Sequence, residues 1–320
     1  MLETIFYICV ALGIIAFAIM ILAYKYRHLQ DELLYYPDMP PGSAQHCDHP
    51  GEYGIERYER LSIVTPDGIT LRGFIMKPST TADPTCCIVY FHGNAGNVGQ
   101  RLPIAKMFIN KLRAAVIMVD YRGYGLSDKV PPNEEGLEVD CQAVLDWAVV
   151  HSKVPCDRIF LMGTSLGGAA VGYLASKERN NRKYAGVIIE NSFTSISDMG
   201  DVLIGPILTQ KLPRASKCLI PFLKHVVKPI VLFIGWDNLN RVRSIELPAL
   251  FLSSAQDELV LASQYKVFYD NCKSHVKQFV SFPTGKHNDL WQKEGYCDAI
   301  GAFIRTAVSS QSQSSTVDVV

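Results

Sequence analysis

The pentapeptide GTSLG at 163–167 matches the pattern G-x-S-x-G. It follows an apolar stretch at 158–162 that is typical of a strand, and it opens a small-residue stretch at 166–176 that is typical of a helix. A serine at such a strand–turn–helix junction sits on a tight turn, which requires small neighbours. The helix N-terminus beneath it favours developing negative charge. We therefore predict that Ser165 is a catalytic nucleophile.

A serine hydroxyl needs a base, and an acid that orients this base, to act as a nucleophile at neutral pH. His287 is the best placed of the eight histidines, because it lies between the last predicted strand and the last predicted helix. Asp257 follows another predicted strand, so the chain order is serine, aspartate, histidine. Glu190 ends a further predicted strand and is the alternative acid, since carboxyl ends of parallel strands carry active groups. The predicted catalytic triad is Ser165, Asp257 and His287.

The oxygen of an attacked carbonyl needs two backbone N–H donors while it carries negative charge. We expect one from Leu166, the residue after the nucleophile, and one from the loop HGNAG at 92–96. Asn94 is the preferred residue of this loop, and Ala95 is the alternative. A phosphate-binding loop is not favoured here, because the lysine and the glycine spacing of such loops are missing.

Strand-like and helix-like segments alternate from residue 55 to residue 308, the span predicted for the main domain. Buried strands that alternate with helices predict an α/β fold, with a mostly parallel central sheet and helices on both faces. The turn tripeptide PDG at 66–68 predicts an antiparallel hairpin at its start. The predicted strands are 56–64, 69–76, 86–91, 114–120, 158–163, 185–190, 248–253 and 276–282, and the predicted helices end at 112 or cover 134–150, 166–176 and 288–306.

Two segments fall outside this alternation. A long insertion with apolar clusters, at about 194–247, is expected to form a lid over a site, because long connections in compact domains are usually functional; extra core is the alternative. The serine-rich and glutamine-rich segment 309–320 is expected to be a disordered tail.

The N-terminal residues 1–24 are expected to form a transmembrane anchor. The run from Ile5 to Tyr24 is apolar throughout and long enough to cross a bilayer as a helix. A cleaved signal peptide is less favoured, because there is no basic start and no small-residue cleavage site. A polar and proline-rich linker is expected over 25–54. Lys25 and Arg27 on the C-terminal flank favour a cytosolic main domain.

The overall composition excludes several classes of protein. The 320 residues carry 31 basic and 31 acidic side chains, with no basic tract, which argues against nucleic acid as a partner. Charged residues make up 19% and apolar ones 48%, the reverse of a disordered chain. The polar segment HCDH at 46–49 lacks zinc-site spacing, so we expect no metal there and no metal or organic cofactor in the protein.

Taken together, FHGNAGN (91–97), VDYRGYG (119–125), GTSLGG (163–168), AQDELV (255–260) and GKHND (285–289) resemble the α/β-hydrolase superfamily in order and spacing. With the N-terminal anchor, the chain is similar to the bud-emergence-homologue subgroup. The resemblance implies an α/β-hydrolase fold and a Ser–Asp–His hydrolase. It also implies a single-pass protein of type II topology, with the main domain outside the cytosol. This disagrees with the flanking charges, so the side of the membrane stays open.

The sequence thus predicts a membrane-anchored serine hydrolase that cleaves an acyl ester or thioester through an acyl-enzyme. A lipid-like substrate is favoured by the apolar insertion and the anchor, as for a lipase. A protein depalmitoylating thioesterase that acts on S-acylated proteins is the alternative, and a non-catalytic binding module on the same fold is a third. The expected partners are the lipid bilayer and the acyl substrate.

Overall fold

The computed structural model describes residues 2–80, 82–232 and 234–317. The chain divides into two compact units. The first combines residues 1–34 with 195–236, and the second combines 35–194 with the chain from 237 onward. The first unit therefore joins the N-terminal apolar segment to most of the predicted insertion, whereas the second contains the sheet.

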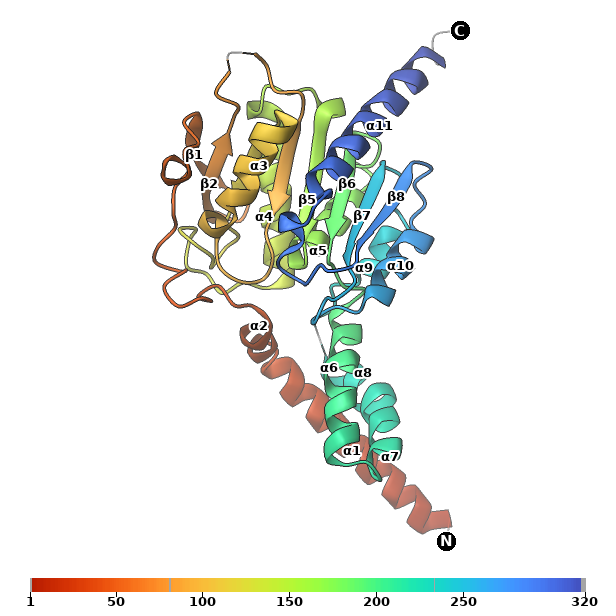
Figure 1. The fold of residues 1–320 in the computed structure, drawn as a ribbon. Helices are drawn as coiled ribbons and strands as arrows, with labels where there is room; N and C mark the ends of the chain where they lie inside the picture. The colour runs from red at the N-terminus through yellow and green to blue at the C-terminus, as the bar shows by residue number, and fades with distance from the viewer. Residues whose placement is uncertain (1, 81, 233, 318–320) are drawn as a thin grey trace. The chain divides into compact units, whose positions relative to one another are not determined.

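The second unit is built on one mixed sheet, whose eight strands in the described residues follow the order β1-β2-β4-β3-β5-β6-β7-β8 (Figure 1). β1 pairs antiparallel with β2, and β2 pairs antiparallel with β4. All the other neighbouring pairs are parallel. The predicted α/β class, mostly parallel sheet and initial hairpin are confirmed. The strands are β1 (Tyr58–Val64), β2 (Thr70–Met76), β3 (Cys87–Phe91), β4 (Ala115–Val119), β5 (Ile159–Thr164), β6 (Gly186–Glu190), β7 (Ala249–Ser254) and β8 (Lys277–Phe282).

The central strands are covered on both faces. Every residue of β3, β4, β5, β6 and β7 is buried, as expected of parallel strands between two helical layers. α3 (Leu102–Leu112) and α11 (Tyr296–Val317) contribute to a hydrophobic core with one face of these strands. α4 (Glu134–His151) and α5 (Leu166–Ser176) pack together against the sheet as well. Two shorter helices complete the unit, α9 (Asn238–Val242) and α10 (Ala262–Asn271).

Part of the predicted linker is ordered against the second unit. Asn97 Nδ2 donates to the backbone oxygens of Ser43 and His46, both at 2.7 Å. Tyr36 forms an isolated parallel bridge with Ala95. The chain before the first strand is therefore bound to the loop after β3, near the predicted oxyanion donors, and a short 3₁₀ helix covers Pro50–Tyr53.

The first unit is helical. It contains α1 (Leu2–Lys25), α2 (His28–Leu34), α6 (Ile196–Lys211), α7 (Ser216–Phe222), a π-helical turn (Leu223–Val227) and α8 (Lys228–Val231). Within the described residues, α1 is the one helix both long and apolar enough to cross a bilayer. The insertion predicted at 194–247 is divided, because Thr194 and residues 237–247 belong to the sheet unit. Its action as a lid stays a prediction.

The C-terminal region differs from the expected pattern. The predicted last helix at 288–306 is present as α11 but begins at Tyr296, after a 3₁₀ turn at Leu290–Gln292. α11 continues to Val317, into the segment where a disordered tail is expected from residue 309. Residues 318–320 of the predicted tail lie outside the described residues.

Candidate active site

Ser165 lies at a sharp turn between β5 and α5. Its backbone has φ 55° and ψ −115°, a positive-φ conformation that costs energy for a residue with a Cβ. The turn is possible because its neighbours are glycines. A Cβ on Gly163 would lie 2.0 Å from the backbone oxygen of Gly167, and one on Gly167 would lie 1.9 Å from that of Phe91. This is the geometry predicted for a nucleophile on a strand–turn–helix junction.

His287 and Asp257 are brought together from loops that follow β8 and β7. His287 Nδ1 lies 2.8 Å from Asp257 Oδ2 and 3.0 Å from Oδ1, and the imidazole is buried. A neutral imidazole that donates from Nδ1 to this carboxylate has its lone pair on Nε2. The pair has the arrangement of a general base and the acid that orients it.

Asp257 is fixed by further donors. The backbone N–H groups of Leu259 and Val260 donate to Oδ1, both at 2.8 Å, and the Tyr265 hydroxyl donates to Oδ2 at 2.8 Å. Burial opposes ionisation of this carboxyl, but the hydrogen bond and charge of His287, with the two amides, hold the pKa of Asp257 below its usual value. The carboxylate is therefore ionised at neutral pH and its orientation is fixed.

Glu190, the alternative acid, lies in a different environment. It is buried, and its carboxylate accepts a hydrogen bond from the Tyr296 hydroxyl. Burial raises the pKa of Glu190 to about 7, although hydrogen bonds from Tyr296 and Thr164 oppose the rise. Asp257 contacts His287 Nδ1 with both oxygens, and its role as the orienting acid stays a prediction.

The segment 190–192, at the end of β6, links the serine to the histidine. The backbone oxygen of Glu190 accepts from Ser165 N at 2.8 Å, and Ser192 Oγ donates to the backbone oxygen of Ser165 at 2.9 Å. Between them, Asn191 Nδ2 donates to the backbone oxygen of His287 at 2.9 Å. The loops of the predicted nucleophile and base are thus bonded to adjacent residues of one strand end.

Asn191 is a site residue that the sequence did not predict. Its side chain is fully buried, and its Oδ1 accepts from Ser254 N at 3.0 Å while its Nδ2 donates to Ser254 Oγ at 2.8 Å. It therefore ties the strand end that precedes Asp257 to the loop that carries His287. Its φ is 45°, a conformation that asparagine adopts more readily than most residues. This preference is the one feature of the residue type that points to a special position.

The predicted oxyanion loop follows β3 and lies against the serine turn. A Cβ on Gly93 would lie 3.7 Å from the Cβ of Ser165. The loop is held by Tyr121, whose hydroxyl donates to the backbone oxygen of His92 at 2.9 Å, and by Tyr124, whose hydroxyl donates to Asn94 Oδ1 at 2.9 Å. Leu166 is the first residue of α5 and is buried. The roles of the Asn94 and Leu166 amides stay predictions.

A buried polar pair lies behind this loop. His92 Nε2 is 3.5 Å from Asp120 Oδ1, and the same oxygen accepts from Val98 N at 2.8 Å. Burial raises the pKa of Asp120 to about 7 and lowers the pKa of His92 to about 3. Near pH 7 His92 is therefore neutral, whereas Asp120 is about half protonated. The low basicity of His92 suits a loop-bracing residue better than a second base.

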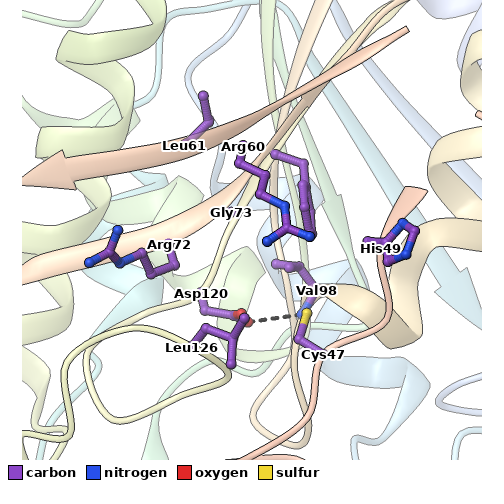
Figure 2. Close-up of a pocket in the computed structure, with 10 residues that line it drawn as sticks. Cys47, His49, Arg60, Leu61, Arg72, Gly73, Val98, Asp120 and Leu126 are labelled. Atoms are coloured by element: carbon purple, nitrogen blue, oxygen red, sulfur yellow. Dashed lines mark hydrogen bonds between the residues drawn. The ribbon is translucent and has the colours of Figure 1, made fainter. Parts of the chain in front are cut away.

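Asp120 also faces a small surface pocket of about 270 Å³ (Figure 2). Arg60 and Arg72 from the first hairpin line this pocket, together with Cys47 and His49 from the segment expected to be polar and metal-free. In the described residues, no group of three or more histidine, cysteine or acidic side chains is placed to hold a metal ion. None of the predicted triad residues lines the pocket, so it is separate from the candidate active site.

The alpha/beta hydrolase fold family matches residues 87–206 of the chain. Over 294 residues, 91% of each chain, the protein is 33% identical to protein bem46 of Schizosaccharomyces pombe. Over 271 residues, 83% of each chain, it is 34% identical to alpha/beta hydrolase domain-containing protein WAV2 of Arabidopsis thaliana. The chain belongs to this Bem46 and WAV2 family of α/β-hydrolases. The family resemblance expected from the motifs is confirmed.

Solved structures support the fold of this Bem46 and WAV2 family member. An esterase of Pyrococcus furiosus matches 81% of the chain and 94% of its own with a TM-score of 0.63 at 18% identity. An acetyl xylan esterase of Paenibacillus matches 78% of the chain and 83% of its own with a TM-score of 0.59 at 17% identity. A further relative, 32% identical over 91% of this chain and 94% of its own, is named as a membrane protein of Saccharomyces cerevisiae.

Proposed function

We propose that the protein is a membrane-anchored serine hydrolase that cleaves an acyl ester or thioester. The observation that carries this proposal is the contact of His287 Nδ1 with both carboxylate oxygens of Asp257. A buried imidazole oriented in this way is suited to accept a serine proton on Nε2. The apolar α1 supplies the anchor.

The mechanism follows from the positions of these groups. His287 Nε2 removes the proton of Ser165 Oγ as the oxygen attacks the acyl carbonyl carbon, and the carbonyl oxygen takes the negative charge. The amides of Leu166 and Asn94 bind this oxyanion. The imidazolium, stabilised by ionised Asp257, then protonates the alcohol or thiol leaving group. Water, deprotonated by His287, attacks the acyl-enzyme and releases the acid.

A lipid-like acyl substrate is proposed because the anchor would hold the enzyme at a bilayer, and because the insertion at 194–247 is rich in apolar residues. An S-acylated membrane protein offers the same acyl carbonyl with a thiolate leaving group, which makes protein depalmitoylation the second candidate. The flanking charges favour a cytosolic hydrolase domain, whereas the family resemblance implies a domain outside the cytosol. The proposal therefore includes acyl substrates on either side of the membrane.

The decisive experiment is covalent labelling of the full chain by a fluorophosphonate. The wild type is expected to be labelled, and Ser165→Ala is expected to lose both the label and roughly 10⁶-fold in turnover if the triad acts as a unit. Unlabelled wild-type protein that is folded would point to a non-catalytic binding module. A series of esters and thioesters with increasing acyl length then tests the substrate. Equal turnover of short and long chains would contradict the lipid-like assignment.

A further inference from the structure

A cavity of about 550 Å³ lies within the helical first unit, far larger than a packing defect and within the size range of small-molecule sites. It lies between α6, α7, the π-helical turn and α8, and it is partly open to the surroundings. Its walls are mainly aliphatic and include Leu208, Ile220, Leu223, Val227, Val231 and Leu232. This apolar lining is only partly buried, so an apolar ligand in the cavity would remove more of it from the surroundings.

The polar side chains of the cavity carry an excess of positive charge. Lys228 Nζ lies 2.7 Å from Asp201 Oδ1, and Lys224 Nζ lies 3.1 Å from Asp201 Oδ2. Lys228 Nζ also donates to the backbone oxygen of Ser197 at 3.1 Å. Two ammonium groups therefore share one carboxylate, which leaves a net charge of about +1 on an otherwise apolar lining. A ligand that suits this cavity has an apolar chain and an anionic group.

Gly200 contributes to the open space. It lies inside α6 and lines the cavity, and a Cβ added to it would meet nothing within 4 Å. Glycine within a helix costs up to about 1 kcal/mol relative to alanine. The chain therefore has its smallest side chain at a wall position where a larger one would fit sterically.

The cavity lies beside the apolar N-terminal helix. α8 packs against α1 within the first unit, and Gln30 Nε2, in α2, donates to the backbone oxygen of Val231 at 2.6 Å. Figure 1 shows α6, α7 and α8 alongside α1. If α1 crosses a bilayer, the cavity is held within reach of its lipids, and these are the most abundant molecules that combine an apolar chain with a charged headgroup.

We propose that this cavity binds one acyl chain of an anionic membrane lipid, with the lipid headgroup at Lys224 and Lys228. The site is formed by other residues than the predicted triad, so it does not require catalysis. It does rest on the membrane anchoring in the proposed function. The bound lipid fills the cavity and ties the α6–α8 segment to the leaflet that α1 enters.

The test uses the full chain in phosphatidylcholine vesicles that contain phosphatidylserine with a photoactivatable diazirine on one acyl chain. After irradiation, peptide mass spectrometry is expected to find the label on residues that line the cavity. Gly200→Leu places a four-carbon side chain in the cavity and is expected to reduce this labelling at least about tenfold relative to Gly200→Ala, which gains a similar helix propensity but adds only one methyl group. Equal labelling of the two variants, or labelling confined to α1, overturns the proposal.

The headgroup is tested with a diazirine phosphatidylcholine of the same chain length. We expect the anionic probe to label the cavity several-fold more than the zwitterionic probe, and Lys224→Gln to remove this preference while the Lys228–Asp201 pair remains. Equal labelling by both probes in the wild type contradicts the anionic assignment. Competition by free fatty acid as effective as that by phosphatidylserine would also overturn it, because the ligand would then be a free fatty acid and not a phospholipid.

Two controls separate this inference from the proposed function. Ser165→Ala is expected to keep the cavity label, since the serine is not part of the lining. A wild-type protein that does not react with fluorophosphonate but carries the cavity label would contradict the catalytic proposal alone. A wild-type protein that reacts with fluorophosphonate and sediments with membranes, but shows no label in the cavity, would contradict the lipid site alone.

Discussion

At the scale of single residues, two carboxylates near the candidate base have opposite environments. Asp257 receives two backbone amides, a tyrosine hydroxyl and the His287 imidazole, which favour its charged form. Glu190 is buried beside Tyr296, and its pKa is raised to about 7. When two environments shift the pKa values of two acids in opposite directions, the acids suit different roles. Asp257 is the one suited to stabilise an imidazolium.

This difference predicts the outcome of exchanging each acid for its amide. Asp257→Asn is expected to reduce kcat by about 10⁴-fold, because an amide in this position favours the wrong imidazole tautomer. Glu190→Gln keeps an acceptor for the Tyr296 hydroxyl and is expected to stay within about tenfold of the wild type. Ester hydrolysis by the full chain in detergent measures both. Full activity of Asp257→Asn with loss in Glu190→Gln would reassign the acid.

A second residue-scale prediction concerns Asn191, which donates to the backbone oxygen of His287. Asn191→Asp keeps an acceptor for Ser254 N but loses the donor, so the histidine loop is expected to shift. Fluorophosphonate labelling should slow by about 10- to 100-fold, the effect of a displacement near 1 Å. Asn180→Asp is the control, because Asn180 is also buried but donates to Gln142 and Leu174. Equal slowing in both variants would indicate general destabilisation.

At the scale of elements, the close approach of α5 to β3 positions Ser165. Gly167 and Gly172 lie in the same helix but face different surroundings. A Cβ at Gly167 would lie 1.9 Å from a backbone oxygen of β3, whereas one at Gly172 would meet its nearest neighbour, Arg241 Cβ, at 3.9 Å. The contact of α5 with β3 can therefore be tested by comparing alanine substitutions at these two glycines, of which only Gly172 has room for a Cβ.

Gly167→Ala is expected to destabilise the protein by about 1–3 kcal/mol or more and to abolish fluorophosphonate labelling, because neither backbone can move without displacing the serine turn. Gly172→Ala is expected to retain labelling and to gain up to about 1 kcal/mol from helix propensity. Thermal unfolding and labelling rates check both. Labelling of Gly167→Ala at the wild-type rate would mean that this helix contact does not set the position of Ser165.

At the scale of the whole molecule, a helix of the length and hydropathy of α1 is expected to hold the chain in a membrane. Ile14 and Ile15 lie near its middle and are largely exposed to the surroundings. Arginine at a helix centre costs about 2.5–3.5 kcal/mol of insertion free energy. The double variant Ile14→Arg with Ile15→Arg should therefore leave the alkali-resistant membrane fraction, whereas the two Ile→Leu changes should not. Retention of the arginine variant in that fraction would require a second membrane contact.

The amino-acid sequence by itself determined the features that depend on neighbouring residues. The serine turn, the alternation of buried strands with helices, the first hairpin and the apolar N-terminal helix all follow from local patterns of residue type. Chain order and strand ends were enough to name Ser165, Asp257 and His287 as candidates, and to leave Glu190 as a competitor.

Only the tertiary structure decided between contacts that residues distant in the chain can make. It paired His287 with Asp257, brought Asn191 between both loops, and joined 195–236 to the N-terminal helices in place of the sheet. No repeating pattern of residue types along the chain indicates these contacts. The contacts between loops depend on how strand crossovers bring the loops to one edge of the sheet, and the helix contacts depend on which helices share an apolar surface. The cavity beside α1 was not predicted for the same reason. Its walls come from several helices, and the distances between these helices cannot be read from a local sequence pattern.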